Sequence, residues 1–437
     1  MGKSNRSTTS QSKPNKLRWL RLDNAAKIYP ASRNNNWSNI FRLSATLTEP
    51  VDTEILSSAL DITVRRFPSI AARLRKGVFW YYLEQLPQAP TISQEGSFPL
   101  MHMSRSAVRK CAFRVIVYRN RIAVEFFHSL TDGTGGLIFL KSLLAEYLQR
   151  KYGTPIPTGD GILDRTEEPS PEELEDSFPK YAGPCSASRR ESNAFRLTGT
   201  PETDGYRNLT CFHLDTRQVL DAAHAQGVSL TSYLCAVLLQ AILELQREKI
   251  PFRQFRKPVK VQIPVNLRSL FPSKTLRNFA LYTNPEVDPR LGEYSLSEIC
   301  KLVHHHLGMA VTAKQMSTQI AANVKSERSP FVRLMPLFLK NIALKIAFLT
   351  VGERKICLSL SNLGNVKLPP EMSRHIERMD FILAPQASAP HNCGVLSYNG
   401  KLYVNFIRSI REPELEAHFF RVLQQQGLQV LVESNGR

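Results

Sequence analysis

The sequence lacks any pair of cysteines close enough to form a Cys-x-x-Cys motif. Its seven cysteines are an odd number and lie far apart, at Cys111, Cys185, Cys211, Cys235, Cys300, Cys357 and Cys393. This distribution argues against a disulfide framework. We therefore predict free thiols in a reducing compartment and a cytoplasmic protein.

A long uninterrupted apolar run is also missing. The most apolar stretch, residues 331–351, contains Arg333, Lys340, Lys345 and Pro336. A membrane-spanning helix needs about 20 mostly apolar residues with few or no charges. We predict no transmembrane segment and interpret this stretch as a buried helix with a basic edge. The second interpretation, a helix that makes weak contact with a membrane surface, stays open.

Acidic residues are scarce relative to basic ones. The chain has 57 Lys and Arg against 38 Asp and Glu, a formal net charge of +19. The basic residues are spread along the chain, with no long Lys/Arg block outside the polar start, residues 1–16. A dispersed surplus favours an anionic small molecule or an acidic carrier over nucleic acid as the partner.

The length of 437 residues suits two domains of similar size. We expect a disordered basic tail at 1–16, an N-terminal half at 17–160, a linker rich in Pro, Ser, Glu and Asp at 161–206, and a C-terminal half at 207–437. Strands and helices alternate without a regular βαβ pattern, which predicts an α/β (α+β) fold with a mixed sheet and flanking helices in each half.

Residues 113–152 have the most informative pattern. Residues 113–118 and 122–127 are β-rich and are separated by the turn Arg119-Asn120. A polar cluster follows at once, His128-Ser-Leu-Thr-Asp132-Gly133, and then an apolar helix predicted for residues 136–152. The cluster therefore lies where a strand ends and a helix begins. Elsewhere, alternation predicts a strand at residues 40–47, and helical spacing predicts a helix that starts at Asp52. Asp23-Asn24 is predicted as a turn or cap.

His128 has the chemistry of a general base. Acyl transfer to an alcohol or amine needs a group that removes a proton as the acceptor attacks, and the pKa of histidine lies near neutrality. Asp132 is close enough in sequence to order the ring, and Gly133 permits a tight turn before the helix.

The HxxxDG sequence resembles the core motif of the coenzyme A-dependent acyltransferase superfamily, which includes chloramphenicol acetyltransferase and the condensation domains of nonribosomal peptide synthetases. Three further segments share the resemblance: Phe67-Pro-Ser-Ile-Ala-Ala-Arg73, Pro264-Val-Asn-Leu-Arg268 with Asn278-Phe279, and Ser359-Leu-Ser-Asn-Leu-Gly364. The resemblance spans nearly the whole chain and is greatest to bacterial alcohol acetyltransferase-like proteins.

The resemblance implies two chloramphenicol acetyltransferase-like halves with an active-site tunnel between them, and His128 as the base. It also implies that Asp132 turns away from His128 and forms a structural ion pair with Arg268. Two features differ from the family. Condensation domains commonly have two adjacent histidines, whereas Phe127 precedes His128 here, and the DFGWG motif of the plant enzymes is missing.

Three polar residues are candidates for binding an oxyanion or a substrate group: Asn278, Ser361 and Asn362. The alternative for each of them is an ordinary turn, which needs no functional role. His304-His305-His306 suggests a metal site, but consecutive residues on a helix point in different directions, so we predict a solvated helix face and no metal.

These observations predict an acyltransferase that moves an acyl group, acetyl in the first instance, from a coenzyme A thioester to a small hydroxyl or amine acceptor in a ternary complex. We expect a monomer with no permanently bound cofactor and acyl-CoA as co-substrate. One alternative keeps the chemistry and changes the donor to the acyl-phosphopantetheine of an acyl carrier protein. A second alternative is a non-catalytic binding protein on the same fold.

Overall fold

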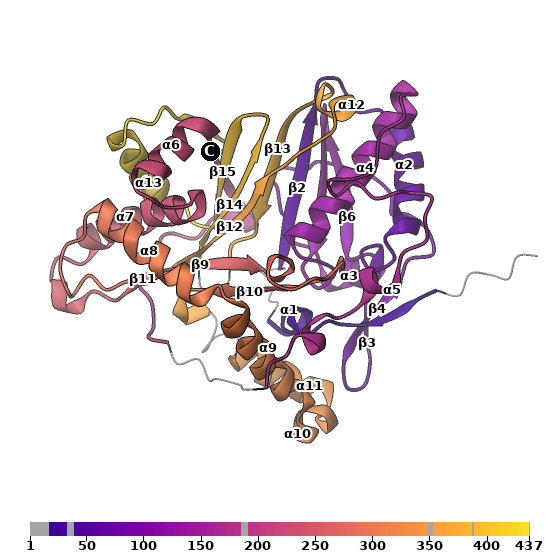
Figure 1. The fold of residues 1–437 in the computed structure, drawn as a ribbon. Coiled ribbons are helices and arrows are strands. Elements are labelled where there is room, and N and C mark those ends of the chain that lie inside the picture. The colour runs from indigo at the N-terminus through magenta and orange to yellow at the C-terminus, as the bar shows by residue number, and fades with distance from the viewer. Residues whose placement is uncertain (1–16, 33–38, 185–190, 348–352, 387–388, 437) are drawn as a thin grey trace, which may run out of the picture.

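In the part of the chain that the structure describes, two large mixed β-sheets have flanking helices, and a smaller three-stranded sheet accompanies them (Figure 1). The computed structural model describes residues 17–32, 39–184, 191–347, 353–386 and 389–436. The first 16 residues, predicted as a disordered tail, lie outside the described residues. The mixed α/β architecture predicted from the sequence is confirmed.

The N-terminal sheet has the strand order β13-β2-β7-β6-β5. Its strands are β2 (Ile40–Leu47), β5 (Ser93–Gln94), β6 (Phe113–Tyr118), β7 (Arg121–Phe127) and β13 (Ile376–Leu383). All neighbours are antiparallel except β5 and β6, which are parallel. Helices α2 (Thr53–Arg66) and α4 (Gly133–Tyr152) pack on each other beside this sheet (Figure 1).

Local sequence explains these elements. Asp52 caps α2 by accepting hydrogen bonds from the Glu54 and Ile55 amides, as expected for a helix that starts after this residue. Strand β2 has the predicted bounds, and β6 and β7 form the predicted hairpin. Helix α4 begins three residues earlier than predicted, at Gly133, because the Asp132 side chain caps it.

The C-terminal sheet has the order β10-β9-β12-β14-β15-β8-β16, with β11 also paired to β9. Its strands are β8 (Asn208–Asp215), β9 (Val259–Asn266), β10 (Ala280–Thr283), β11 (Glu286–Val287), β12 (Leu358–Asn365), β14 (His391–Tyr398), β15 (Lys401–Arg408) and β16 (Leu431–Ser434). Strand β12 is parallel to both β9 and β14. The main helices of this half are α6 (Thr216–Ala225), α7 (Leu230–Lys249), α8 (Leu296–Ala310) and α13 (Glu414–Gln425).

The chain does not keep its two halves separate. Strand β13 belongs to the C-terminal half by sequence, yet it pairs along β2 in the N-terminal sheet, with Phe381 opposite Leu43. Accordingly, the N-terminal hydrophobic core includes Met379, Phe381 and Ile382. The two halves therefore share one sheet.

Smaller elements complete the structure. A three-stranded sheet has the order β1-β4-β3, with β1 (Trp19–Arg21), β3 (Ala72–Lys76) and β4 (Tyr81–Gln85). The remaining helices are α1 (Ile28–Ser32), α3 (Arg105–Lys110), α5 (Pro171–Leu174), α9 (Ala313–Arg328), α10 (Pro330–Leu334), α11 (Leu337–Ala347) and α12 (Pro370–Ser373).

The prediction of one buried helix over residues 331–351 is wrong. Pro336 separates α10 from α11, and the large apolar side chains Phe331, Leu334 and Phe338 are 74%, 74% and 60% exposed. Residues 348–352 of this stretch lie outside the described part of the chain. Among the described helices, none is by itself long and apolar enough to cross a bilayer. Helices α6 and α7 combine sufficient length with sufficient apolarity only as a pair, which is bent by 82°.

Candidate active site

His128 lies at the end of β7, in the short loop that leads to α4. Its backbone amide donates to the Asn39 carbonyl at 2.8 Å, which fixes the start of the loop. The imidazole is half-buried and stacks on Tyr29, with ring centroids 4.5 Å apart, while the edge of Phe41 packs at 5.1 Å. The ring is therefore held between aromatic neighbours.

Asn278 determines which imidazole nitrogen has the proton. Its Nδ2 amide group donates to the His128 carbonyl at 2.9 Å and to Asp23 Oδ2 at 3.3 Å. These two acceptors orient the side chain so that Oδ1 lies 3.0 Å from His128 Nδ1. Because an amide oxygen only accepts, Nδ1 must be the donor, and Nε2 keeps its lone pair. The arrangement thus leaves Nε2 as the basic atom.

Asp23 anchors this arrangement from the N-terminal segment. The carboxylate is fully buried, accepts from the Ala26 amide at 2.7 Å and lies 3.7 Å from the Arg277 guanidinium. Burial raises the pKa of Asp23, and the charge of Arg277 opposes that effect. The turn expected at Asp23-Asn24 is present and leads into the short 3-10 helix Ala25–Lys27.

Burial also lowers the pKa of His128 below its ordinary value. A hydrogen bond with its own backbone carbonyl, the charge of Asp132 and the hydrogen bond with Asn278 act in the opposite direction and are smaller. A lowered pKa favours the neutral imidazole near pH 7, which is the form that can accept a proton.

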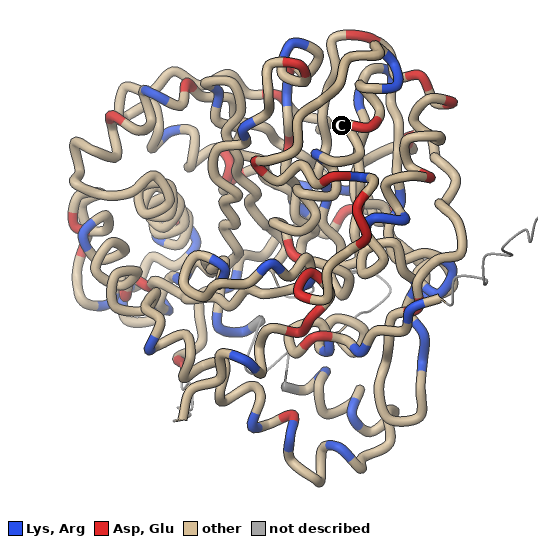
Figure 2. Tube along the Cα trace, turned by 45° about the vertical axis from the view of Figure 1, so that its right-hand side comes forward, with Lys and Arg blue, Asp and Glu red and all other residues tan. Residues whose placement is uncertain are grey.

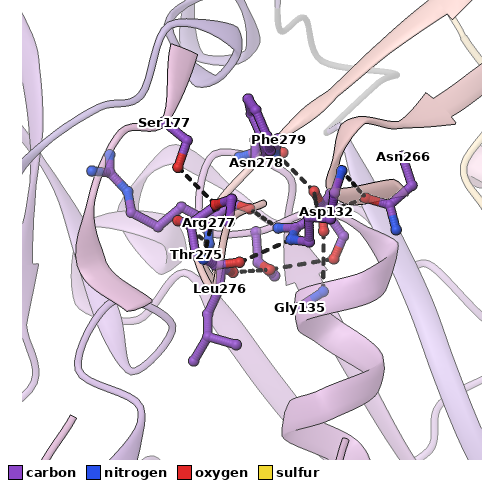
Figure 3. A network of polar contacts seen from close by, with 12 residues as sticks. Asp132, Gly135, Ser177, Asn266, Thr275, Leu276, Arg277, Asn278 and Phe279 are labelled. Carbon is purple, nitrogen blue, oxygen red and sulfur yellow. Dashed lines mark hydrogen bonds and ion pairs between the residues drawn. The ribbon is translucent and has the colours of Figure 1, made fainter. Parts of the chain in front are cut away.

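The Asp132 carboxylate binds residues of the C-terminal half, and Figure 3 shows it next to Phe279. Its Oδ2 lies 2.8 Å from Arg268 Nη1 and accepts from the Phe279 amide at 2.8 Å. Its Oδ1 caps α4 by accepting from the Gly135 amide at 3.0 Å. The ion pair with Arg268 that the family resemblance implied is present, and the carboxylate joins the helix to the other half.

The same network holds the segment between Thr275 and Phe279 against α4 (Figure 3). Arg268 donates through Nε to the Thr275 carbonyl at 2.9 Å and through Nη2 to the Arg277 carbonyl at 2.6 Å. The Thr131 hydroxyl donates to the Leu276 carbonyl at 2.6 Å. Asn278, which lies within this segment, is consequently placed at His128 by contacts around Asp132.

Gly133 brings the end of β12 close to the motif. A side chain at Gly133 would place its Cβ 2.7 Å from Leu363 Cδ2, so the glycine permits close packing of two distant segments. Ser361 and Asn362 are half-buried on this part of β12. The Asn362 amide donates to the Thr231 hydroxyl at 3.0 Å, and its Oδ1 accepts from the Gly364 amide at 2.8 Å.

The structure therefore separates the three polar candidates. Asn278 uses its amide hydrogens within the protein and serves His128, so it does not fit the predicted oxyanion or substrate role. Asn362 is engaged with Thr231 of α7 and with the Gly364 amide of its own turn. Tyr29 and Asp23 were not predicted as parts of the site, because no local motif links them to a residue that lies about a hundred positions further along the chain.

The other reactive side chains lie apart from this site. His304 and His305 are exposed on α8, and His306 Nε2 lies 2.7 Å from the Thr283 hydroxyl. No group of His, Cys, Asp or Glu that could hold a metal ion occurs among the residues that the structure describes. Burial raises the pKa of Cys111 to about 11 and that of Cys357 to about 12, which disfavours reactive thiolates.

No protein-family model matches the sequence, and no curated protein matches it. Solved structures do match over nearly the whole chain. Trichothecene 15-O-acetyltransferase from Fusarium sporotrichioides is 12% identical, with a TM-score of 0.62 and coverage of 96% of each chain. TRI101 from F. graminearum, complexed with coenzyme A and T-2 mycotoxin, is 12% identical, with a TM-score of 0.60 and coverage of 94% of this chain and 99% of that chain. The first condensation domain of the CDA synthetase is 13% identical, with a TM-score of 0.57 and coverage of 95% and 100%.

At these identities the likeness concerns the fold. The chain has the two-lobed, condensation-domain-like fold of coenzyme A-dependent acyltransferases, as the resemblance in its motifs implied. At the level of the fold, acyl transfer is the chemistry associated with these neighbours.

Proposed function

We propose that the protein is an acyltransferase that moves an acyl group from a coenzyme A thioester to a small hydroxyl or amine acceptor, with His128 as general base. One observation supports this proposal above all others. Asn278 accepts the Nδ1 proton of a half-buried imidazole and thereby keeps Nε2 unprotonated. A histidine with a purely structural role would not need a fixed basic nitrogen.

The proposed reaction is a direct transfer in a ternary complex. His128 Nε2 takes the proton of the acceptor as its oxygen or nitrogen attacks the thioester carbonyl carbon. The resulting tetrahedral intermediate collapses with cleavage of the carbon–sulfur bond, and the imidazolium returns the proton to the leaving thiolate. No covalent acyl-enzyme is required, and base catalysis of this kind typically contributes about 10²–10⁴-fold.

Asn278 supports both stages of this cycle. While the ring is neutral, it fixes the tautomer, and while the ring is charged, its Oδ1 stabilises the Nδ1–H of the imidazolium. Asp132 has a different task, because its carboxylate is occupied by Arg268, the Phe279 amide and the start of α4. We propose that Asp132 and Arg268 hold the two halves in register around His128.

Ser361 is the remaining candidate for stabilising the oxyanion. It lies two residues before Leu363, whose side chain packs against Gly133 of the motif. A hydroxyl at this position can donate a hydrogen bond to the developing negative charge. We propose this role for Ser361 in place of Asn278.

The donor is proposed to be free acyl-CoA, with acetyl-CoA as the first choice. TRI101, which shares this fold, has been crystallised with coenzyme A, and the net charge of +19 suits a polyanionic donor. A carrier-bound donor is the second candidate, because condensation domains share the fold as well. Competition between free acyl-CoA and an acyl-loaded carrier protein would distinguish the two donors.

The proposal is tested by incubating the protein with mixed acyl-CoAs and a panel of alcohols and amines, followed by mass analysis of the products. Wild-type protein should form an acylated acceptor together with free coenzyme A, and His128→Ala should not do so at a comparable rate. His305→Ala removes an exposed histidine on α8 and is the matched control. Full activity of His128→Ala would refute the assignment.

A further inference from the structure

An exposed apolar surface occupies the lower edge of the molecule as drawn in Figure 1, at α10, α11 and the turn between β3 and β4. We call it the apolar patch and define it by six side chains that are between 44% and 75% exposed: Val78, Phe79, Phe331, Leu334, Phe338 and Ile342. Side chains of this size are more often buried, so a cluster of them at the surface indicates an interaction site.

Side-chain and backbone contacts join the two parts of the patch. The Leu337 amide donates to the Val78 carbonyl at 3.1 Å. Lys340 Nζ donates to the Phe79 carbonyl at 2.9 Å and lies 3.7 Å from the centre of the Trp80 ring. Lys340 is itself buried, so it serves as an internal connection and does not face solvent. The hairpin turn and the two helices therefore present one surface.

Helical geometry aligns the apolar side chains. Phe338 and Ile342 are four residues apart on α11 and lie on one face, while Leu337 and Lys340 occupy the buried face. Phe331 and Leu334 are three residues apart on α10, just before the break at Pro336. The burial pattern shows that these side chains point outward along both helices.

The described segments that form the patch have basic but no acidic side chains. Lys76, Arg333 and Lys345 are exposed beside it, and residues 72–81 and 330–347 contain no Asp or Glu. In Figure 2 the lower edge, where Figure 1 places α10 and α11, shows basic positions with few acidic ones. The neighbouring α9 contains Glu327, which is paired with Lys27.

We propose that the apolar patch docks the protein on the surface of an anionic lipid bilayer. Apolar side chains that protrude from short helices can enter the boundary of headgroups and acyl chains, while adjacent Lys and Arg bind anionic headgroups. A second copy of the chain fits less well, because a symmetric interface through this patch would bring Lys76, Arg333 and Lys345 of both copies together without acidic partners.

The test is flotation of the full-length protein with lipid vesicles. Wild-type protein should float with vesicles of phosphatidylcholine and phosphatidylglycerol, and weakly or not at all with phosphatidylcholine alone. High salt should reduce flotation because it screens the attraction to anionic headgroups. The absence of flotation with anionic vesicles would overturn the proposal.

Paired variants assign binding to the patch. Leu334→Asp with Phe338→Asp should lower vesicle binding about tenfold or more, because apolar area no longer enters the bilayer. Phe252→Asp, at a side chain that is 65% exposed in the loop between α7 and β9, is the control and should bind as wild type does.

Arg333→Glu or Lys345→Glu should each lower binding about fivefold or more. Lys401→Glu, at the exposed start of β15, should leave vesicle binding unchanged.

Two further results would show that something other than a lipid bilayer covers the patch. Equal vesicle binding by the patch variants and the wild type would place the lipid contact elsewhere and overturn the proposal. Sedimentation that shows a wild-type dimer and a monomeric Phe338→Asp variant would assign the patch to self-association and also overturn it. Because the substituted side chains are exposed, the variants should unfold at the same temperature as the wild type. This result would show that the variants bind vesicles less well while still folded.

Discussion

At the scale of single residues, the proposed chemistry depends on how the Asn278 side-chain amide orients the His128 imidazole. Asn278 reaches His128 from a position 150 residues further along the chain, and its own orientation is fixed by a carbonyl and by Asp23. The chemistry assigned to His128 therefore requires both halves of the molecule. Sequence spacing alone could not have shown this dependence.

Asn278→Ala should lower kcat with little effect on KM. Without Asn278, the proton of the neutral His128 ring is no longer fixed on Nδ1, and the imidazolium loses its hydrogen-bond partner. A hydrogen bond to a charged group contributes about 1.5–3 kcal/mol, which corresponds to a loss of roughly 10–100-fold. The variant should also lower the pKa of His128 further, since the hydrogen bond with Asn278 raises it. Unchanged kcat together with an unchanged acid limb of the pH profile would show that Asn278 is only structural.

Asp132→Ala should destabilise the protein and also lower the rate of the proposed acyl transfer. Removing one partner of a buried ion pair typically costs about 3–5 kcal/mol, and loss of a helix cap costs about 1 kcal/mol. Urea unfolding of Asp132→Ala, Arg268→Ala and the double variant would measure the coupling between the two residues. Wild-type stability combined with a pure loss of rate would contradict the structural role proposed for Asp132.

The motif predicted part of the site but not its surroundings. His128 and the partnership of Asp132 with Arg268 could be anticipated because HxxxDG and the Arg268 segment resemble a known pattern. Tyr29, Asp23 and the orientation of Asn278 could not, because they depend on packing between segments that are far apart in sequence. The resemblance identified Asn278 as a polar candidate, and only the geometry assigned its amide to His128.

At the scale of elements, the site is a strand end joined to a capped helix and closed by a crossing segment. Gly135 lies in the first turn of α4, where an added Cβ would clash with the Leu276 carbonyl oxygen and the Thr131 hydroxyl. The helix and the segment between Thr275 and Phe279 can approach this closely only because the residue has no side chain.

Gly135→Ala should therefore destabilise the protein and displace Asn278 from His128. Overpacking of this kind typically costs about 1–3 kcal/mol. Gly308→Ala, in α8, is the matched control because its Cβ would meet no neighbour within 4 Å, and it should be neutral or stabilising by up to about 1 kcal/mol. Thermal unfolding of both variants tests this difference in stability, and equal unfolding temperatures of Gly135→Ala and Gly308→Ala would contradict it.

Elements with a strong local pattern were predicted well, and elements defined by their neighbours were not. Strands β2, β6 and β7 followed from alternation and turn chemistry. The stretch that became α10 and α11 was predicted to be buried because of its apolar composition. Composition reports how apolar a helix is, but not whether another part of the protein covers it.

At the scale of the whole molecule, the two halves are interdependent. Strand β13 completes the N-terminal sheet from the C-terminal part of the sequence, so a boundary drawn near residue 206 cuts through a shared core. A division by composition could not show that the chain crosses back, because composition does not report which strands pair.

A fragment of residues 1–206 should consequently fail to fold on its own. Without β13, the edge of β2 loses its hydrogen-bonding partner, and the core loses Phe381 and Met379. Circular dichroism and gel filtration of the fragment should show loss of tertiary structure or aggregation. A monomeric fragment that unfolds cooperatively would contradict this expectation.

The apolar patch and the proposed active site are also connected at this scale. Helix α11 packs against α1, which contains Tyr29, and the Tyr29 ring stacks on His128. A protein docked on a bilayer through the patch would therefore have its proposed catalytic base one short helix away from the docking surface.

The most direct test of the central claim is the pH dependence of kcat/KM for wild type and His128→Ala. Burial disfavours the protonated imidazole, so the pKa of His128 lies below its ordinary value of about 6.5. Wild-type kcat/KM should therefore fall as the pH drops through that lowered pKa, so that the midpoint of the acid limb lies below pH 6.5. His128→Ala should lose about 10²–10⁴-fold on the plateau and should lack this acid limb. A variant with the same plateau and the same limb would show that His128 is not the base.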